Sequence, residues 1–207
     1  MQVIAVNVGQ ARTLVKGRGQ SKTGIFKTAV EGPVTVGPLG LEGDVQVNRK
    51  HHGGPDQAVY LYAADDYVWW QSQLGRELEP GTFGENLTLD TFGTEPLAVG
   101  DRLRLGEVLL ELTAPRVPCA TLAARMGEPG FVKRFHQAGR PGVYARVLEA
   151  GRLEAGQTAN WEARGQVSIE ELFGLVYQSK AEPARLAAVL AAPVASRLRE
   201  LLESRLA

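Results

Sequence analysis

Glycine and proline interrupt this chain so often that few long helices or strands can form. The 207 residues include 24 glycines and 11 prolines. One short apolar segment, residues 34–36, is bounded by Gly32-Pro33 on one side and Gly37-Pro38 on the other. Short strands separated by such turn residues are typical of barrels and sandwiches, whereas regular alternation of strands and helices would indicate an α/β sheet. We therefore predict a mainly β fold.

The clearest strand signal is an alternation of polar and apolar residues. Residues 99–105 and 108–112 surround a two-residue turn with this kind of pattern, which predicts a β-hairpin. Residues 63–74 instead have helical spacing, with acidic residues in the first turn and Gly75 at the end. The β region is therefore expected to contain a few short helices.

Residues 165–207 have a helical character. Ser168 and Glu171 have the spacing of a capping box, and Pro183 and Pro193 suit the first turns of helices. We predict a β domain at residues 1–163 and a small all-α appendage at residues 165–207. The apolar stripes of these helices would pack on each other, on the β domain or in a homodimer. The three helices are predicted at residues 168–177, 182–191 and 193–205.

Acidic and basic residues balance at 23 each, so the formal net charge is zero. A neutral chain lacks the long-range attraction that a general binder of nucleic acid or of anionic membranes needs. The sequence also has no run of about 18 apolar residues and no signal-peptide pattern at its N-terminus. We therefore expect no nucleic acid and no membrane as partners, and a cytoplasmic location.

Cys119 is the only cysteine, which excludes an intrachain disulfide and a multi-cysteine metal site. It follows the stiff segment Pro115-Arg116-Val117-Pro118 and precedes a helical pattern at residues 120–126. Backbone N–H groups and the helix dipole at that position, together with the charge of Arg116, favour the thiolate. A thiolate attacks electrophiles or binds metal. The alternative is that Cys119 is a small buried apolar residue.

Residues 11–24 place Lys16, Arg18 and Lys22 among three glycines. This composition predicts a loop. The loop is either a solvated surface segment or an anion-binding arm, because lysines and backbone amides together suit phosphate.

Residues 49–54 have the sequence Arg-Lys-His-His-Gly-Gly, which includes two of the three histidines of the chain. Glycine pairs let a ligand approach the backbone closely. Adjacent histidines do not share a face of a strand, so we expect only one of His51 and His52 to contact a given ligand. The alternative is a turn with surface histidines.

Glu85 and Asn86 lie where a turn at residues 80–84 leads into a strand. Polar residues at such a position either hold the turn in place or orient a polar ligand. Asp44 ends a second glycine-containing segment, residues 40–44, and offers another carboxylate.

Taken in order, these segments resemble the MOSC domain, the domain type named for the C-terminal part of molybdenum cofactor sulfurases. The resemblance extends over essentially the whole chain and is strongest to the YiiM-like subfamily, which carries a C-terminal extension of three helices. The motifs that carry it are G-L-E-G-D at residues 40–44, H-H-G-G-P-D-Q-A-V at 51–59, F-G-E-N-L at 83–87, V-G-D at 99–101 and P-R-V-P-C at 115–119.

The resemblance implies a closed β-barrel-like fold and a molybdenum cofactor, molybdenum bound to molybdopterin, held by non-covalent contacts. It also implies reduction of N-hydroxylated compounds, such as hydroxylaminopurines, amidoximes and hydroxylamines, with the hydroxyl oxygen leaving as water. The electrons would come from a separate flavin or haem protein.

The family's metal-ligating cysteine falls on Cys119, and we expect either His52 or Asp44 to donate the proton. Two alternatives to a reductase are a non-catalytic carrier of the cofactor or of sulfur that uses Cys119, and a structural module with an inert cysteine. The residues expected to contact the cofactor are Lys22, Arg49, His51, His52, Gly53, Gly54, Asp56, Gly84, Glu85, Asn86 and Arg116.

Overall fold

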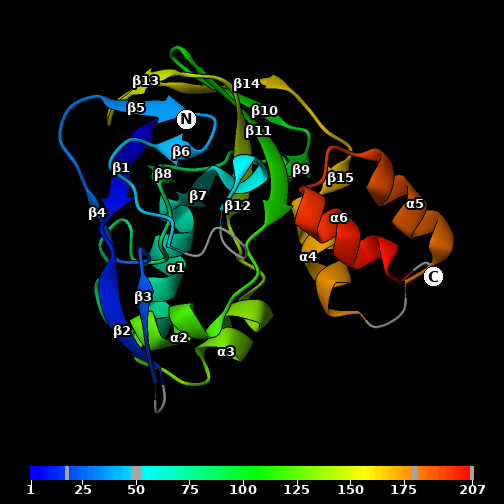
Figure 1. Cartoon of the computed structure of the whole chain (residues 1–207). Helices are drawn as coiled ribbons and strands as arrows, with labels where there is room; N and C mark the ends of the chain where they lie inside the picture. The colour runs from blue at the N-terminus through cyan, green and yellow to red at the C-terminus, as the bar shows by residue number, and fades with distance from the viewer. Residues whose placement is uncertain (17–18, 48–52, 179–180, 206–207) are drawn as a thin grey trace.

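A mixed β-sheet forms the body of the protein, and the described residues include six α-helices that cover parts of it (Figure 1). Helices α4 to α6, coloured orange to red, gather beside the β-rich body, whereas hairpin β2–β3 projects next to α2. The computed structural model describes residues 1–16, 19–47, 53–178 and 181–205.

The main sheet contains eight short strands. Every neighbouring pair is antiparallel except β7 and β8, which run parallel and are connected through helix α1. In pairing order the strands are β14 (Ala159–Ala163), β10 (Arg102–Leu105), β11 (Val108–Pro115), β12 (Val143–Glu149), β7 (Val59–Ala63), β8 (Leu87–Leu89), β1 (Val3–Gly9) and β4 (Lys27–Ala29).

Three smaller sheets accompany the main sheet. The first pairs β13 (Gly151–Leu153) with β5 (Val34–Gly37) and β5 with β6 (Gly40–Leu41). The others are the pair β15 (Val167–Ser168) with β9 (Ala98–Val99), and the hairpin of β2 (Arg12–Lys16) with β3 (Gly19–Thr23).

The expectation of a closed β-barrel-like fold is wrong. The main sheet ends at β14 on one side and β4 on the other, and these two strands do not pair. In the described part of the chain, an isolated bridge between Gln2 and Thr158 and a few backbone hydrogen bonds, such as Val3 N–H to the Gln157 carbonyl over 2.9 Å, connect the start of β1 to the segment before β14 without a strand pairing that closes the sheet. The sequence pattern of short strands and turns suits several small sheets as well as it suits a barrel, so it could not distinguish them.

The predicted loop at residues 11–24 is also wrong. Five cross-strand pairs, from Arg12 with Thr23 to Lys16 with Gly19, form a regular antiparallel hairpin. The charges and glycines of this segment suggested a loop, but Thr13, Leu14 and Val15 supply a strand-forming centre.

The predicted helices of the β region are confirmed. Helix α1 (Ala64–Leu74) ends at Gly75, whose φ of 63° is the left-handed conformation that glycine adopts readily. Helix α2 (Ala120–Met126) starts directly after Cys119 and ends at Gly127, and α3 (Phe131–Ala138) follows it.

Three C-terminal helices are present, as predicted: α4 (Ile169–Tyr177), α5 (Pro183–Ala191) and α6 (Ser196–Glu203). The Ser168 hydroxyl accepts a hydrogen bond of 3.0 Å from the backbone N–H of Glu171, which confirms the N-terminal cap. Apolar residues of all three helices belong to the same hydrophobic cluster as the sheet, and α4 packs on β11.

A second buried cluster is rich in aromatic side chains and lies between the sheet and helices α1 to α3. Trp70 stacks on Phe135, and the Trp70 indole N–H donates to the Tyr62 hydroxyl over 2.8 Å. The cluster also contains Tyr60 and Tyr144, which reach the cavity described below.

Asp56 ties the C-terminal helices to the body. It lies in the 3₁₀ turn Pro55–Gln57, and one carboxylate oxygen accepts from the Ser196 backbone N–H over 2.8 Å and from the Ser196 hydroxyl over 2.6 Å. The other oxygen lies 2.9 Å from the Arg146 guanidinium. Burial would raise the pKa of Asp56, but these partners outweigh it and lower the pKa.

Asp56→Asn is expected to lower the free energy of unfolding by about 1–2 kcal/mol at pH 7, because Ser196 and Arg146 lose a charged acceptor. Since the folded-state pKa lies below the unfolded value of about 3.8, the carboxylate's contribution is complete above that value and is lost as pH falls through the folded pKa. Urea unfolding from pH 7 to pH 3 measures both effects. Exposed Glu95→Gln serves as the control, and a wild-type advantage that does not shrink in acid would contradict the assignment.

Candidate functional site

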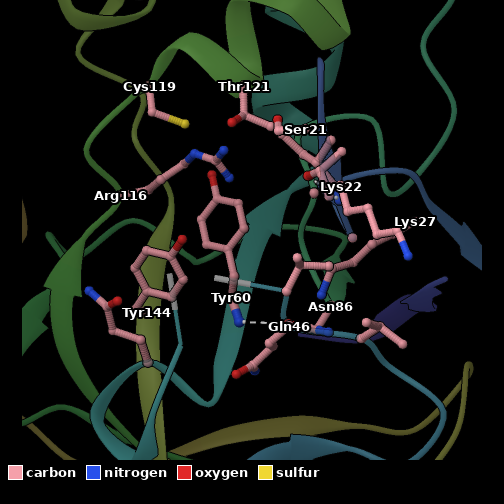
Figure 2. A pocket seen from close by; sticks show the side chains of 17 residues that line it. Ser21, Lys22, Lys27, Gln46, Tyr60, Asn86, Arg116, Cys119, Thr121 and Tyr144 are labelled. Carbon is pink, nitrogen blue, oxygen red and sulfur yellow. Dashed lines mark hydrogen bonds between the residues drawn. The ribbon is translucent and has the colours of Figure 1, made fainter. Parts of the chain in front are cut away.

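A cavity of about 210 Å³ lies between hairpin strand β3, the start of helix α2 and strands β7 and β12 (Figure 2). Segments distant in the sequence supply its walls, and cationic and hydroxyl side chains gather there. The lining residues are Ser21, Lys22, Thr23, Gly24, Ile25, Lys27, Val45, Gln46, Val47, Gln57, Tyr60, Gly84, Asn86, Arg116, Cys119, Thr121 and Tyr144.

Cys119 lies at one side of the cavity. It is the residue before α2, and its extended backbone turns the chain from the segment after β11 into the helix. The side chain is only partly buried, and Figure 2 shows the sulfur directed toward Arg116. A buried apolar role, the alternative considered from sequence, does not describe a thiol that lines a cavity.

Arg116 places a buried positive charge beside Cys119. The residue is 4% exposed, and its Nη1 donates to the Phe83 carbonyl over 2.6 Å. Its Nε has no hydrogen-bond partner among the described residues, and its Cζ lies 5.0 Å from the centre of the Tyr60 ring. Burial acts to lower the pKa of Arg116, but the neighbouring Tyr144, Tyr60 and Cys119 side chains raise it overall. A buried guanidinium with an unused donor suits an anionic ligand.

Lys27 is a second buried cation, and sequence reasoning missed it. Its Nζ lies 2.6 Å from Oδ2 of Asp44. Burial lowers the pKa of Lys27, and the charge of Asp44 opposes that effect. The only sequence signal was a lysine in the strand-like segment 26–30, where an apolar residue would ordinarily face the interior.

Asp44 connects three parts of the cavity wall. Its Oδ1 accepts a 2.8 Å hydrogen bond from the Gly9 backbone, and its Oδ2 accepts from Lys27 and, over 3.0 Å, from the Asn86 amide. Asn86 in turn accepts from the Tyr60 backbone N–H over 3.1 Å, as the dashed line in Figure 2 shows. Asp44 therefore supports the cavity from behind, since it is not among the lining residues.

Glu85 points away from the cavity into the protein interior. It is fully buried and accepts from the Tyr67 hydroxyl, from the Gly81 backbone over 2.7 Å and from the Thr88 hydroxyl over 2.9 Å. Burial raises its pKa despite these bonds. Glu85 holds the turn before β8, which was the structural alternative for this position.

Tyr60 and Tyr144 bring two phenols to the cavity, with ring centres 5.0 Å apart. Burial raises the pKa of both, so both keep their protons at neutral pH. The Tyr60 hydroxyl donates to the Pro141 carbonyl over 2.8 Å. The Tyr144 hydroxyl makes no hydrogen bond with the described residues, and it interacts electrostatically with Arg116 and Cys119.

The structure brings five of the expected site residues together and leaves others apart. Asp44, Asp56 and Glu85 are engaged elsewhere, and Gly53 and Gly54 precede the 3₁₀ turn that carries Gln57, without lining the cavity. The five that line it are Lys22, Gly84, Asn86, Arg116 and Cys119. The expected residues Arg49, His51 and His52 lie outside the described residues.

Gly84 is one position where only glycine fits. Its φ is +81°, and a Cβ atom there would lie 2.8 Å from the Ile25 side chain and 3.7 Å from Nη1 of Arg116.

Within the described part of the chain, no three His, Cys, Asp or Glu side chains are grouped to hold a metal ion. His51 and His52 lie outside the described residues and are not among these side chains.

This fold and this cavity are those of a MOSC-domain protein. The MOSC domain model matches residues 48–160, more than half of the chain, so the chain belongs to that family.

Individual relatives place it near the YiiM proteins. The crystal structure of YiiM from Geobacillus stearothermophilus superposes with a TM-score of 0.82 at 30% identity, and covers 100% of this chain and 99% of that one. YflK from Bacillus subtilis, an uncharacterised protein, is 37% identical over 83% of this chain and 77% of its own length. A protein named as a reductase from Gibberella moniliformis is 35% identical over 68% of this chain, but only 26% of its own length is covered.

None of the helices in the described ranges is both long and apolar enough to cross a membrane.

Asp44→Asn is expected to lower the free energy of unfolding by about 3 kcal/mol, because it leaves the Lys27 ammonium buried without a counter-charge. The pKa of Lys27 then falls further below its ordinary value of 10.5. Since the unfolded chain binds the proton more tightly, the loss should shrink as pH rises toward that value. Urea unfolding between pH 7 and pH 10 measures this change.

The double variant Asp44→Asn with Lys27→Met is the matched control. Removing the unpaired charge should restore part of the lost stability. A double variant no more stable than Asp44→Asn alone would show that the ion pair does not explain the effect.

Proposed function

We propose that the protein is a molybdenum-cofactor-dependent reductase that converts N-hydroxylated compounds, such as hydroxylaminopurines, amidoximes and hydroxylamines, to the corresponding amines or amidines. The observation that carries this proposal is the single thiol of Cys119 beside buried Arg116, whose Nε is unsatisfied. In a MOSC-family chain, that arrangement suits a molybdenum centre that accepts a soft thiolate ligand and is bound to an anionic pterin.

The cavity residues fit the parts of a molybdopterin. Figure 2 places Lys22 and Lys27 across the cavity from Cys119, so a ligand held at the sulfur would extend its anionic end toward two lysines. Asp44 is paired with Lys27, whereas Lys22 forms no ion pair with a described residue, so Lys22 leaves a positive charge for a phosphate. The Gln46 amide supplies polar groups for a pterin ring.

When bound, the molybdenum centre supplies the two electrons that break the N–O bond. Reduction of R–NHOH to R–NH₂ and water also consumes two protons, so the cavity needs a proton donor. Asp44 is turned away from the cavity and already accepts from Gly9, Lys27 and Asn86. We assign the proton-donor role to Tyr144, whose protonated hydroxyl faces Arg116 and Cys119.

Arg116 would assist Tyr144 in two ways. Its positive charge acts to lower the pKa of Tyr144 and so stabilises the phenolate left after proton transfer. Its unused Nε would also bind the oxygen of the leaving hydroxyl. A separate flavin or haem protein would supply the electrons.

A second candidate function is carriage of the cofactor, or of sulfur as a Cys119 persulfide. The partial exposure of Cys119 in the cavity favours this candidate. A carrier would release cofactor or transfer sulfur to an acceptor, and it would reduce no N-hydroxylated compound when a reductant is supplied.

Cys119→Ala is expected to abolish reduction of N-hydroxylated substrates and to lower the molybdenum and pterin content of the purified protein, because the sulfur ligand that the protein supplies is removed. Metal analysis, pterin fluorescence and turnover with reduced viologen measure molybdenum content, pterin content and activity on one preparation. Undiminished turnover would refute the metal-ligand assignment.

Tyr144→Phe is expected to lower kcat about 100-fold, as loss of a general acid does, with KM and molybdenum content nearly unchanged. Because burial raises the pKa of Tyr144, wild-type activity should stay constant through neutral pH and decline only in alkali. Tyr177→Phe, on helix α4 away from the cavity, is the control. A variant with normal kcat and a normal pH profile would exclude Tyr144 as the donor.

A further inference from the structure

Two arginines from separate elements lie over the Phe26 ring, and a third, Arg76, lies next to one of them. Arg12 comes from β2 and Arg125 from α2, and their Cζ atoms lie 5.9 Å and 4.6 Å from the centre of the Phe26 ring. Arg76 follows α1 and donates to the Met126 carbonyl at the end of α2. Burial lowers the pKa of Arg125, and the charges of Arg76 and Arg12 lower it further, although Tyr67 and Glu85 act in the opposite direction.

This group, which we name the Phe26 arginine cluster, forms no ion pair with a carboxylate of the described residues, although the buried Glu85 acts on Arg125 at longer range. None of the three arginines forms an ion pair with a described residue, and the Nε of Arg125 is buried without a hydrogen bond. By contrast, Arg104 is paired with two glutamates elsewhere on the surface. In a chain with zero net charge, three adjacent unpaired guanidiniums are a local excess of positive charge.

Helix α2 connects the cluster to the cavity. Cys119 precedes the first turn, Thr121 lines the cavity, and Arg125 lies in the last turn. Six residues at a rise of 1.5 Å each separate Cys119 from Arg125 by about 9 Å along the helix. A protein bound at the cluster would therefore lie close to the proposed metal ligand.

We infer that the Phe26 arginine cluster is the docking surface for an acidic redox protein that delivers electrons to the cavity. The partially exposed Phe26 ring would form the apolar centre of the contact, and the arginines its charged rim. Electron-transfer complexes are typically small, transient and guided by complementary charge. This inference rests on the proposed function, because only a reductase without its own electron source needs such a partner.

The electron balance defines the partner by class. Each N–O bond cleaved consumes two electrons and two protons and releases one water. A reduced flavin protein with an acidic face would supply the electrons and be oxidised in turn. Two docking events by a one-electron donor, or one by a two-electron donor, satisfy this balance.

The test compares the triple variant Arg12→Gln, Arg76→Gln, Arg125→Gln with a matched variant, Arg102→Gln, Arg152→Gln, Arg185→Gln, on other surfaces. A flavodoxin, a small acidic flavoprotein, serves as the probe. Its Kd for the cofactor-loaded protein at low salt should increase at least about tenfold for the cluster variant and little for the matched variant. Turnover with reduced flavodoxin should fall in parallel, whereas turnover with reduced methyl viologen should stay normal.

Several results would overturn the inference. These are equal weakening in both triple variants, no binding of flavodoxin by the wild type, or loss of viologen-driven turnover in the cluster variant. Displacement of flavodoxin by inorganic phosphate at micromolar concentration would instead identify a small-anion site. The single variant Arg12→Gln, at an exposed position, should show a smaller effect in the same direction and guards against misfolding of the triple variant. Failure of viologen-driven reduction by the wild type would refute the proposed function, while the flavodoxin Kd still decides the docking surface.

Discussion

The ion pair between Lys27 and Asp44 is the interaction on which the cavity depends. Both side chains are nearly inaccessible, at 9% and 1% exposure, so each charge would be costly to bury alone. Hydrogen bonds from Gly9 and Asn86 complete the environment of the carboxylate. The pair thereby fixes β1, β4 and the residues before β8 relative to one another, and it keeps an ammonium group at the cavity wall.

Sequence patterns that extend over a few residues predicted the features that depend on neighbouring residues, such as turns, caps and helix ends. The strand, proline-containing turn and helix around Cys119 appeared as expected because prolines, a terminating glycine and apolar spacing act over a few residues. The N-terminal cap of α4 at Ser168 was predictable for the same reason. The number of β-sheets, and whether the main sheet closes into a barrel, could not be predicted in this way, because the pairing of short strands depends on partners far along the chain.

The residues of the candidate site also fall into two groups: those that the local sequence identifies and those whose role depends on partners far along the chain. Cys119 and Arg116 were identifiable from a stretch of five residues, whereas Lys27 acquires its role from Asp44, 17 positions away, and Asp44 from Asn86, 42 positions away. Asp56 was expected to contact the cofactor because it belongs to the motif at residues 51–59, but its carboxylate faces Ser196, 140 positions later. Tyr144 gave no signal, since a tyrosine in an alternating strand is ordinarily part of the core.

The contact between Asp56 and Ser196 has a consequence for shortened forms of this protein. Gln57, the neighbour of Asp56, lines the cavity. The turn that carries both residues is held by two contacts of Asp56: its carbonyl accepts from the Thr113 hydroxyl, and its carboxylate accepts from Ser196. A product truncated before residue 193 would retain every cavity residue described here, yet it would lack one of those contacts. The C-terminal helices of the intact protein are thus part of the scaffold behind the cavity, even though none of their residues lines it.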